Sequence, residues 1–274
     1  MNKKLNVMII GKGFIFSRHV ESIEKCGGNV LITVDNDPNK KADFLNYKKA
    51  FLSSKFKDVN YIVICTPNDS HLSILKDCLT QTNKEIIIEK PAIISNHFLG
   101  IENNKRINCV LQLRYNPLLP ELKKAIVGDN NKIDLIMKVY RDKNWQLSWK
   151  NNLKKSGGIL MGIAIHMFDL LIVLLGNNYV VVNAENSQKK CTGIIKFPRA
   201  TVSYYVEVMD SREGQTRKLV INDQDFELCN RDNLSFSGFH DRVYEELIKG
   251  NGIPLSEAKK SIKLVLKLKQ YGRE

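Results

Sequence analysis

The chain has 274 residues, of which 43% are hydrophobic and 26% charged, so it is long enough for one large or two modest globular domains. Its formal net charge of +13 suits an anionic partner, such as a nucleic acid, an acidic membrane surface or a phosphorylated small molecule. The lysines are spread along the whole chain, however, and no nucleic-acid-binding signature accompanies them. We therefore expect a solvated basic surface and no nucleic-acid partner.

Cysteine spacing and apolar runs bear on the compartment. The six cysteines include no C-x-x-C pair, so free thiols explain them better than disulfides or zinc. The charged residues 1–6 lead straight into a predicted strand, and we expect no signal peptide. The run Ile159–Gly176 is nearly apolar, but His166 and Asp169 near its middle favour a buried helix over a membrane span. These features predict a cytoplasmic protein without a membrane segment.

Strands and helices alternate in the first half of the chain. A helix is predicted after a glycine turn, another at His71–Gln81, and a third beginning near Ser95. This alternation predicts a doubly wound parallel sheet covered on both faces, in a domain spanning residues 1–116. The predicted strands are Asn6–Ile10, Val30–Val34, a short Lys48–Phe51, Tyr61–Cys65, Glu85–Ile88 and Asn108–Leu113.

Strands follow one another directly in the second half, which indicates a mainly antiparallel sheet. We expect an α+β domain at residues 117–274, with the final helices able to pack back on the first domain. The predicted strands are Ile133–Tyr140, Tyr179–Glu185, Cys191–Phe197, Thr201–Val208, Lys218–Ile221 and Gln224–Leu228. The predicted helices are Leu119–Val127, a long apolar Gly158–Leu175, Phe239–Lys249 and Leu255–Gln270.

A glycine-rich turn follows the first strand and opens a helix, with the sequence Gly11-Lys12-Gly13-Phe14-Ile15-Phe16. Gly11 permits the tight turn, and Gly13 lets backbone N–H groups approach a pyrophosphate at the helix N-terminus. Phe16 stands where such loops usually carry Gly or Ala. Taken alone, this segment is equally well explained as an ordinary turn.

An acidic residue strengthens the interpretation of the glycine turn. Asp35 ends the second predicted strand, where a carboxylate can accept hydrogen bonds from both ribose hydroxyls of a dinucleotide. The same carboxylate repels a 2′-phosphate, so the pattern favours NAD over NADP. The alternative is that Asp35 only starts the turn Asp35–Pro38. With the strand pattern, these features predict an N-terminal Rossmann domain.

Further motifs lie at the carboxyl ends of later predicted strands, where α/β sheets bind ligands. The sequence resembles the glucose–fructose oxidoreductase, inositol dehydrogenase and MocA (Gfo/Idh/MocA) family over nearly its whole length. The motifs that carry this resemblance are Thr66-Pro67-Asn68 with His71, Glu89-Lys90-Pro91, Gly157-Gly158 and Ile165-His166-Met167-Phe168-Asp169.

Within that family the chain is most similar to the UDP-N-acetylglucosaminuronate 3-dehydrogenases, which oxidise the C3 hydroxyl of a nucleotide sugar. The segments that carry this narrower resemblance are Gln112–Pro117, Ser148–Lys150, Lys155–Ile159 and Asp241–Glu246. The resemblance implies NAD as cofactor and a UDP-sugar substrate, which the basic charge suits. It also implies a homo-oligomer formed through the C-terminal sheet.

The resemblance assigns roles by position. The pyrophosphate loop would consist of Gly11, Gly13, Phe14 and Ile15, and Asp35 would bind the adenine ribose. The nicotinamide half would lie beside Thr66, Asn68, His71, Glu89 and Lys90. The sugar would be bordered by Gln112, Arg114, Lys150, Ser156 and His166.

Oxidation of a secondary alcohol needs a base for the hydroxyl proton, with a pKa near the working pH. His166 meets this requirement because an unperturbed imidazole titrates near about 6.5. Lys90 can polarise the same hydroxyl, and the two roles can also be reversed. Asp169, one helical turn from His166, is expected to have a structural role through a bond to nearby backbone. The histidines show no metal-ligand spacing, and we predict no metal site.

One departure from the family concerns the position four residues before His166. The family carries Asp or Asn there, and this chain carries Gly162. Three functions therefore remain open from the sequence. They are a UDP-sugar 3-dehydrogenase, a dehydrogenase of a free sugar or inositol, and a catalytically impaired protein that binds NAD or a sugar.

Overall fold

The computed structural model describes residues 5–98, 100–229 and 236–272. The chain divides into two compact units, each assembled from separate stretches of sequence. Unit 1 comprises Met1–Ile93, His97–Leu111 and Ser237–Ala258, and unit 2 comprises Ile94–Asn96, Gln112–Phe236 and Lys259–Glu274. The boundary after residue 116 stays a prediction. The expectation about a signal peptide falls mainly on residues 1–4, outside the described residues.

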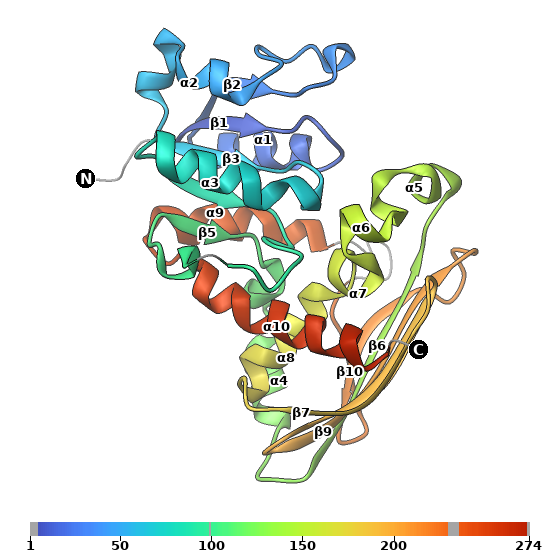
Figure 1. Cartoon of the computed structure of the whole chain (residues 1–274). Helices are drawn as coiled ribbons and strands as arrows, with labels where there is room; N and C mark the ends of the chain where they lie inside the picture. Colours follow the sequence, from blue (N-terminus) through green and yellow to red (C-terminus); the bar gives the residue numbers. More distant parts are fainter. Residues whose placement is uncertain (1–4, 99, 230–235, 273–274) are drawn as a thin grey trace. The chain divides into compact units, whose positions relative to one another are not determined.

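Unit 1 contains a five-stranded parallel sheet with the strand order β2-β1-β3-β4-β5 (Figure 1). The central strand β3 is buried along its whole length, as expected for a strand covered on both faces. The predicted Rossmann-like sheet is thus confirmed. Its strands are β1 (Asn6–Ile10), β2 (Asn29–Val34), β3 (Tyr61–Ile64), β4 (Glu85–Ile88) and β5 (Ile107–Cys109).

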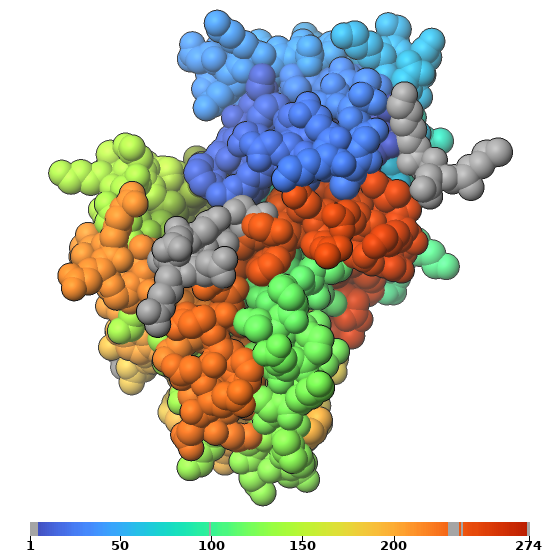
Figure 2. Space-filling model, turned by 180° about the vertical axis from the view of Figure 1, so that it is seen from behind, coloured from blue at the N-terminus to red at the C-terminus, as the bar shows by residue number. Residues whose placement is uncertain are grey.

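Three helices of unit 1 matter for the site: α1 (Phe16–Lys25), α3 (His71–Gln81) and α9 (His240–Ile248). The connections from β1 to β2 and from β3 to β4 run in opposite directions across the sheet. Right-handed crossovers therefore place α1 and α3 on opposite faces. Although α9 comes late in the chain, it packs against α1, and Figure 2 shows its orange-red segment beside the blue N-terminal one.

Three local predictions in the first half are wrong. Lys48–Phe51 belongs to a short helix, α2 (Tyr47–Phe51), because the Asn46 side chain accepts the Lys48 N–H and caps a helical turn. No α-helix begins near Ser95 in the described part of this stretch, where Gly100 adopts a left-handed φ of 78° before a 3₁₀ turn. The strand expected to reach Leu113 ends at Cys109, because the chain then turns into a 3₁₀ segment, η5 (Gln112–Tyr115).

Unit 2 contains a six-stranded sheet with the order β11-β10-β6-β9-β8-β7. Only the pairing of β6 with β9 is parallel among these neighbours, so the predicted mainly antiparallel sheet is confirmed. Residues of β6 and β9 alternate between buried and more exposed, which leaves one face of the sheet outside the core. The strands are β6 (Asn131–Tyr140), β7 (Val180–Asn186), β8 (Lys190–Phe197), β9 (Ala200–Met209), β10 (Thr216–Ile221) and β11 (Gln224–Glu227).

The long apolar helix predicted at Gly158–Leu175 is broken in two. Helix α7 (Gly158–Gly162) ends at a glycine, a poor helix former, and α8 (Ile165–Leu175) begins three residues later. Phe168 of α8 packs edge-on against Tyr204 of β9, with ring centroids 5.4 Å apart. The other helices are α4 (Leu119–Ala125), α5 (Lys143–Leu147), α6 (Leu153–Ser156) and α10 (Leu255–Tyr271).

None of the helices in the described ranges is by itself both long enough and apolar enough to cross a membrane. Leu153–Gly162 and Ile165–Leu175 pass that test only as a pair, bent by 46° at the break between them. All six cysteines are free, and four of them are buried, which agrees with the expectation of free thiols.

Candidate functional site

The glycine loop lies where the strand order of unit 1 reverses, between β1 and β3, which is the usual ligand-binding point of such sheets. Gly11 has a φ of 106°, a conformation that side chains disfavour. A Cβ added to Gly11 would come within 2.8 Å of the Cys65 carbonyl oxygen, at the end of β3. Glycine is therefore required because the two strand ends approach each other so closely.

The second glycine has a different environment. A Cβ at Gly13 would meet no atom within 4 Å, so its backbone is open to a ligand. Phe14 points outward with 71% of its surface exposed, and the Arg18 guanidinium lies 5.2 Å from its ring. Phe16 is only half-buried and lies under the Lys12 ammonium, 5.3 Å from the ring centroid. The bulk of Phe16 thus leaves the space beside Gly13 open, and the loop fits a dinucleotide phosphate at the α1 N-terminus.

The Asp35 carboxylate accepts hydrogen bonds both from the glycine loop and from the turn that Asp35 begins. One carboxylate oxygen accepts the Lys12 backbone N–H at 2.6 Å, and the other accepts the Asp37 N–H at 2.9 Å. The turn interpretation is therefore correct in part. Each carboxylate oxygen can still accept a further hydrogen bond, so the side chain remains suited to ribose hydroxyls.

The loop after β3 is held by its own polar groups. The Thr66 and Ser70 hydroxyl oxygens lie 2.7 Å apart, and Asn68 is buried. His71 is fully buried, with its Nδ1 2.9 Å from the Pro91 carbonyl oxygen and its Nε2 2.9 Å from that of Thr66. Burial lowers the pKa of His71, and the two carbonyls oppose that effect. Because both ring nitrogens face protein oxygens, His71 ties the β3 loop to the turn after β4.

Glu89 is buried, and its carboxylate contacts histidines from two helices that are far apart in the sequence. Its Oε1 lies 3.3 Å from Nε2 of His19 on α1 and 3.5 Å from Nε2 of His240 on α9. Its Oε2 accepts the Lys90 backbone N–H at 3.1 Å. Burial alone would raise the pKa of Glu89, but the two histidines beside its carboxylate hold that pKa well below its usual range.

Sequence reasoning missed this histidine–carboxylate cluster. His19 and His240 are separated by most of the chain, so no linear spacing suggests that they share a partner. The available signal was that His19 lies on the predicted first helix three residues before Ser22 and four before Ile23, a spacing that puts them on one face, which the structure shows to be buried. Only the return of α9 onto α1 brings His240 there.

In unit 2, an ion pair joins η5 to α8. Arg114 donates two hydrogen bonds to Asp169, from Nε at 2.8 Å and from an Nη at 2.9 Å. The Asp169 side chain is 1% exposed and that of Arg114 14%. The partner of Asp169 is thus a guanidinium and not the backbone group that we expected. Gln112, at the start of η5, is buried.

In the segment just before α7, polar side chains hydrogen-bond to the backbone at the ends of short helical turns. Ser156 is buried, donates from its hydroxyl to the Asn152 carbonyl at 2.9 Å, and accepts the Gly158 N–H at 3.1 Å. Lys150 lies half-buried in the 3₁₀ turn Trp149–Asn151, which the Ser148 side chain caps. These contacts fix the backbone on which the predicted sugar-binding side chains stand.

His166 lies in the first turn of α8 and is 4% exposed, with its ring edge-on to Phe236 at 5.7 Å between centroids. Gly162, which replaces the family carboxylate or amide, has room for a side chain. An added Cβ would lie 3.5 Å from the Ser156 carbonyl oxygen, an ordinary contact, and its φ is not left-handed. Lys90 and His166 belong to different compact units.

Two family models match most of the chain. The model described as "Oxidoreductase family, NAD-binding Rossmann fold" matches residues 5–98, which include the glycine loop and Lys90. The model described as "Oxidoreductase family, C-terminal alpha/beta domain" matches residues 128–209, which include His166.

Two characterised relatives are similar in sequence to parts of this chain. Inositol 2-dehydrogenase of Rhizobium meliloti (strain 1021) is 27% identical over 134 residues, which cover 46% of this chain and 40% of the relative. Glucose-6-phosphate 3-dehydrogenase of Bacillus subtilis (strain 168) is 22% identical over 220 residues, covering 73% of this chain and 62% of the relative. The chain thus spans less than two thirds of the length of these relatives.

Solved structures of similar fold cover nearly the whole chain. The WlbA (WbpB) dehydrogenase of Thermus thermophilus, in complex with NAD and UDP-GlcNAcA, has a TM-score of 0.82 and 24% identity, covering 96% of this chain and 94% of that one. The WlbA dehydrogenase of Bordetella pertussis, in complex with NADH and UDP-GlcNAcA, has a TM-score of 0.80 and 17% identity, covering 99% and 97%. At these identities the likeness is one of fold.

Proposed function

Because the chain belongs to the Gfo/Idh/MocA oxidoreductase family, whose models cover both halves, we propose that it is an NAD-dependent dehydrogenase of a UDP-N-acetyl sugar uronate. It would oxidise the C3 hydroxyl to a 3-keto sugar for polysaccharide biosynthesis. The observation that carries the proposal is the glycine loop, which has open space beside Gly13 and no room for a side chain at Gly11.

In this proposal, cofactor binding falls to unit 1. The loop residues Gly11, Gly13, Phe14 and Ile15 present backbone N–H groups to the pyrophosphate, and Asp35 binds the adenine ribose. Thr66 and Asn68 border the nicotinamide half. His71 and Glu89 act indirectly, since their polar atoms already hold the loop after β3 and the turn after β4. When bound, NAD supplies a hydride acceptor for the sugar carbon.

The chain's own contribution to the reaction is proton transfer and orientation. We assign His166 as the base that takes the proton of the C3 hydroxyl, and Lys90 as the group that polarises and orients that hydroxyl. His166, in the first turn of α8, is only 4% exposed, so its ring is largely shielded from bulk water. The assignment requires Lys90 and His166 to reach one sugar ring.

The remaining predicted sugar-binding residues divide into two kinds. Lys150 is half-buried and offers a cation for the diphosphate or carboxylate of the substrate. Gln112, Arg114 and Ser156 are tied into unit 2, and in our proposal they shape the wall of the sugar site. The net charge of +13 supports an anionic substrate.

A second candidate is a dehydrogenase of a free sugar or inositol, and the similarity to inositol 2-dehydrogenase favours it. A third is a catalytically impaired protein that binds NAD or a sugar, which the missing side chain at Gly162 favours. The first candidate alone requires the UDP moiety for turnover.

The deciding experiment incubates the purified chain with NAD and, in turn, UDP-GlcNAcA, UDP-GlcNAc, inositol and glucose 6-phosphate, and follows NADH absorbance. We expect turnover with UDP-GlcNAcA alone. His166→Ala and Lys90→Ala should each slow it roughly 10²–10⁴-fold. Turnover of inositol without a UDP requirement would select the second candidate, and NAD binding without turnover of any substrate would select the third. If His166→Ala keeps full activity and Lys90→Ala abolishes it, the two roles are exchanged.

We also propose that the protein is cytoplasmic and forms a homo-oligomer through the outer face of the six-stranded sheet. This face has a shallow hollow of about 630 Å³ over β6, β8 and β9. Lys138 and Lys190 lie over the Tyr205 ring there, at 5.4 and 4.9 Å from its centroid. Tyr205→Glu should convert the oligomer to a monomer by light scattering. An oligomer of unchanged mass would place the interface elsewhere.

A further inference from the structure

In the buried cluster of His19, Glu89 and His240, three polar atoms have no hydrogen-bond partner among the described residues: the Nε2 atoms of the two histidines and Oε1 of Glu89. The two histidine Nε2 atoms both lie near Glu89 Oε1, at 3.3 and 3.5 Å. The side chains are 0%, 10% and 1% exposed, respectively. A buried carboxylate is stable as an anion only with a compensating charge or full hydrogen bonding.

The location of each proton can be worked out from the surrounding hydroxyls. Ser22 has one hydroxyl proton, and its Oγ donates to the Asp241 carboxylate at 2.5 Å. The same Oγ lies 3.1 Å from Nδ1 of His240 and has no second proton to give. Nδ1 of His240 must therefore carry a proton and donate it to Ser22.

The other ring nitrogen of His240 then decides the charge of the cluster. Its Nε2 lies 3.5 Å from Glu89 Oε1, and neither atom has a hydrogen-bond partner among the described residues, so an Nε2 without a proton would leave a lone pair beside a carboxylate, which is repulsive. We propose that His240 carries a proton on both ring nitrogens and forms a buried ion pair with Glu89, while His19 stays neutral.

His19 has a different proton donor nearby. Its Nδ1 lies 2.7 Å from the Tyr244 hydroxyl, which can donate to it, so that a neutral His19 carries its proton on Nε2, 3.3 Å from Glu89 Oε1. Full burial lowers the pKa of His19, and the charge of His240 acts in the same direction. The cluster then holds one negative and one positive charge, so its net charge is zero.

A metal ion in place of the proton is the main alternative, because the three ligand atoms lie within 4.8 Å of one another. A divalent cation with one carboxylate and two neutral imidazoles leaves a buried net positive charge. A water molecule can supply the fourth ligand of such a site, so the number of protein ligands does not decide between the two. The uncompensated positive charge favours the proton.

The cluster bears on the candidate reaction through the other oxygen of Glu89. That oxygen, Oε2, accepts the backbone N–H of Lys90 at 3.1 Å. His240 is thus a positioning residue, since it orients the carboxylate that holds the Lys90 backbone. This step rests on the proposed role of Lys90, whereas the charge state of His240 does not.

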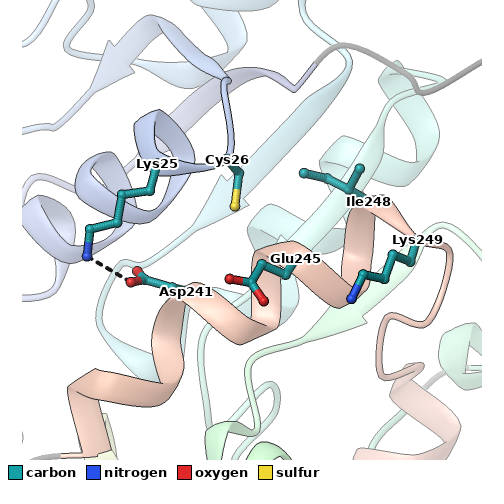
Figure 3. Close-up of a pocket in the computed structure, with 6 residues that line it drawn as sticks. All are labelled: Lys25, Cys26, Asp241, Glu245, Ile248 and Lys249. Carbon is teal, nitrogen blue, oxygen red and sulfur yellow. Dashed lines mark hydrogen bonds and ion pairs between the residues drawn. The ribbon is translucent and has the colours of Figure 1, made fainter.

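A hydrogen-bonded path connects the cluster to solvent. Asp241, which accepts from Ser22, borders a pocket of about 320 Å³ and pairs with the Lys25 ammonium at 2.8 Å (Figure 3). The pocket is lined by Lys25, Cys26, Asp241, Glu245, Ile248 and Lys249. The path Asp241–Ser22–His240 gives the buried ring a way to exchange protons with water.

The charge state is tested by ¹⁵N-detected NMR of the imidazole rings in the full-length protein at neutral pH. We expect both nitrogens of His240 to show a directly bonded proton, and only Nε2 of His19 to do so. The variant His240→Gln assigns the signals, and the exposed His97→Gln serves as the matched control. A His240 ring with one proton overturns the proposal, as does a stoichiometric metal found by elemental analysis.

Pairwise substitution tests the ion pair even where single variants fold poorly. His240→Gln and Glu89→Gln should each lower Tm by roughly 5–10 °C, because each leaves a buried charge without its partner. The double variant is neutral and should melt above His240→Gln alone. If the Tm losses of the two single variants simply add up in the double variant, the ion pair of His240 and Glu89 is ruled out.

The positioning role has a separate readout. His240→Gln should reduce kcat by about tenfold or more, while the Kd for NAD, measured by calorimetry, changes less than about threefold. Loss of NAD binding together with kcat contradicts positioning of Lys90. If no sugar nucleotide is turned over at all, the proposed function fails, while the NMR and melting results still decide the ion pair.

Discussion

Both carboxylate oxygens of Asp169 accept hydrogen bonds from the Arg114 guanidinium, at 2.8 and 2.9 Å, and this pair is nearly shielded from water. It ties η5, which follows the last strand of the first sheet in sequence, to α8, whose first turn contains His166. A two-point contact of this kind fixes orientation as well as distance. The pair therefore sets where α8 presents His166.

Asp169→Asn should destabilise the protein by about 3 kcal/mol in urea unfolding, because it leaves the Arg114 charge without its anionic partner. The exposed pair of Lys189 and Asp210, whose side chains are 60% and 69% exposed, provides the matched control. Asp210→Asn should cause no measurable change, since exposed ion pairs contribute little. Equal effects of the two variants would show that burial does not decide the strength of the Arg114 pair.

The two glycines of the phosphate loop should respond differently to alanine. Gly11→Ala should lower Tm by several degrees, since its Cβ would clash with the Cys65 carbonyl and its φ is left-handed. Gly13→Ala should leave Tm within about 2 °C of wild type, because nothing lies within 4 Å, but it should weaken NAD binding roughly tenfold or more. Calorimetry with NAD and thermal melting separate the two effects. A Gly13→Ala variant with unchanged NAD affinity would place the pyrophosphate elsewhere.

The strands of the first sheet were predictable because most of them are apolar or β-branched runs followed by a turn. The same rule failed at Lys48–Phe51, where the Asn46 cap starts a short helix. Gly158–Leu175 is apolar apart from His166 and Asp169, and periodicity alone cannot show that it breaks at Gly162. Prediction from the local sequence pattern is therefore least reliable where a capping side chain starts a helix or a glycine ends one.

The parts of the candidate site that depend on long-range contacts could not be predicted from the sequence. The glycine loop and Asp35 lie close together in the chain, and their spacing carries the geometry. The contacts of Glu89 with His19 and His240 depend on a late helix returning to the first one. His71 looked like a ligand-binding residue, yet its ring lies between two carbonyls contributed by neighbouring strand ends.

Asp35 should control the choice between dinucleotides. Asp35→Ala removes a charged acceptor for the ribose and should weaken NAD binding roughly 10–100-fold, since a hydrogen bond to a charged group contributes about 1.5–3 kcal/mol. NADP should be less affected, because the variant no longer repels its 2′-phosphate. Asp37→Ala, on the same turn, is the control and should keep the preference for NAD. An unchanged ratio of NAD to NADP affinity in Asp35→Ala would exclude Asp35 from ribose binding.

Gly162 should accept the side chain that relatives carry. Because an added Cβ makes only an ordinary 3.5 Å contact with the Ser156 carbonyl, Gly162→Asn should fold as wild type does. If the missing amide limits the rate, this variant should raise kcat on UDP-GlcNAcA about tenfold, and Gly162→Ala should not. A drop in kcat with normal Tm would show that this chain uses the empty space for its substrate.

The response of stability to pH should report the buried neutral histidine His19. Burial is the largest cause that lowers the pKa of His19 below its ordinary value of 6.5. Below pH 6.5 the unfolded chain therefore binds more protons at this site than the folded chain. The free energy of unfolding should then fall as the pH drops, by at most about 1.4 kcal/mol per pH unit from this group.

His19→Gln keeps a donor for Glu89 and cannot titrate, so its free energy of unfolding should fall less steeply between pH 6.5 and 5.5 than that of wild type. Urea denaturation at fixed ionic strength measures both slopes. Because His71 is also buried with a lowered pKa, some slope should persist in His19→Gln. A slope identical to wild type would mean that His19 binds its proton equally well in the folded and unfolded chains.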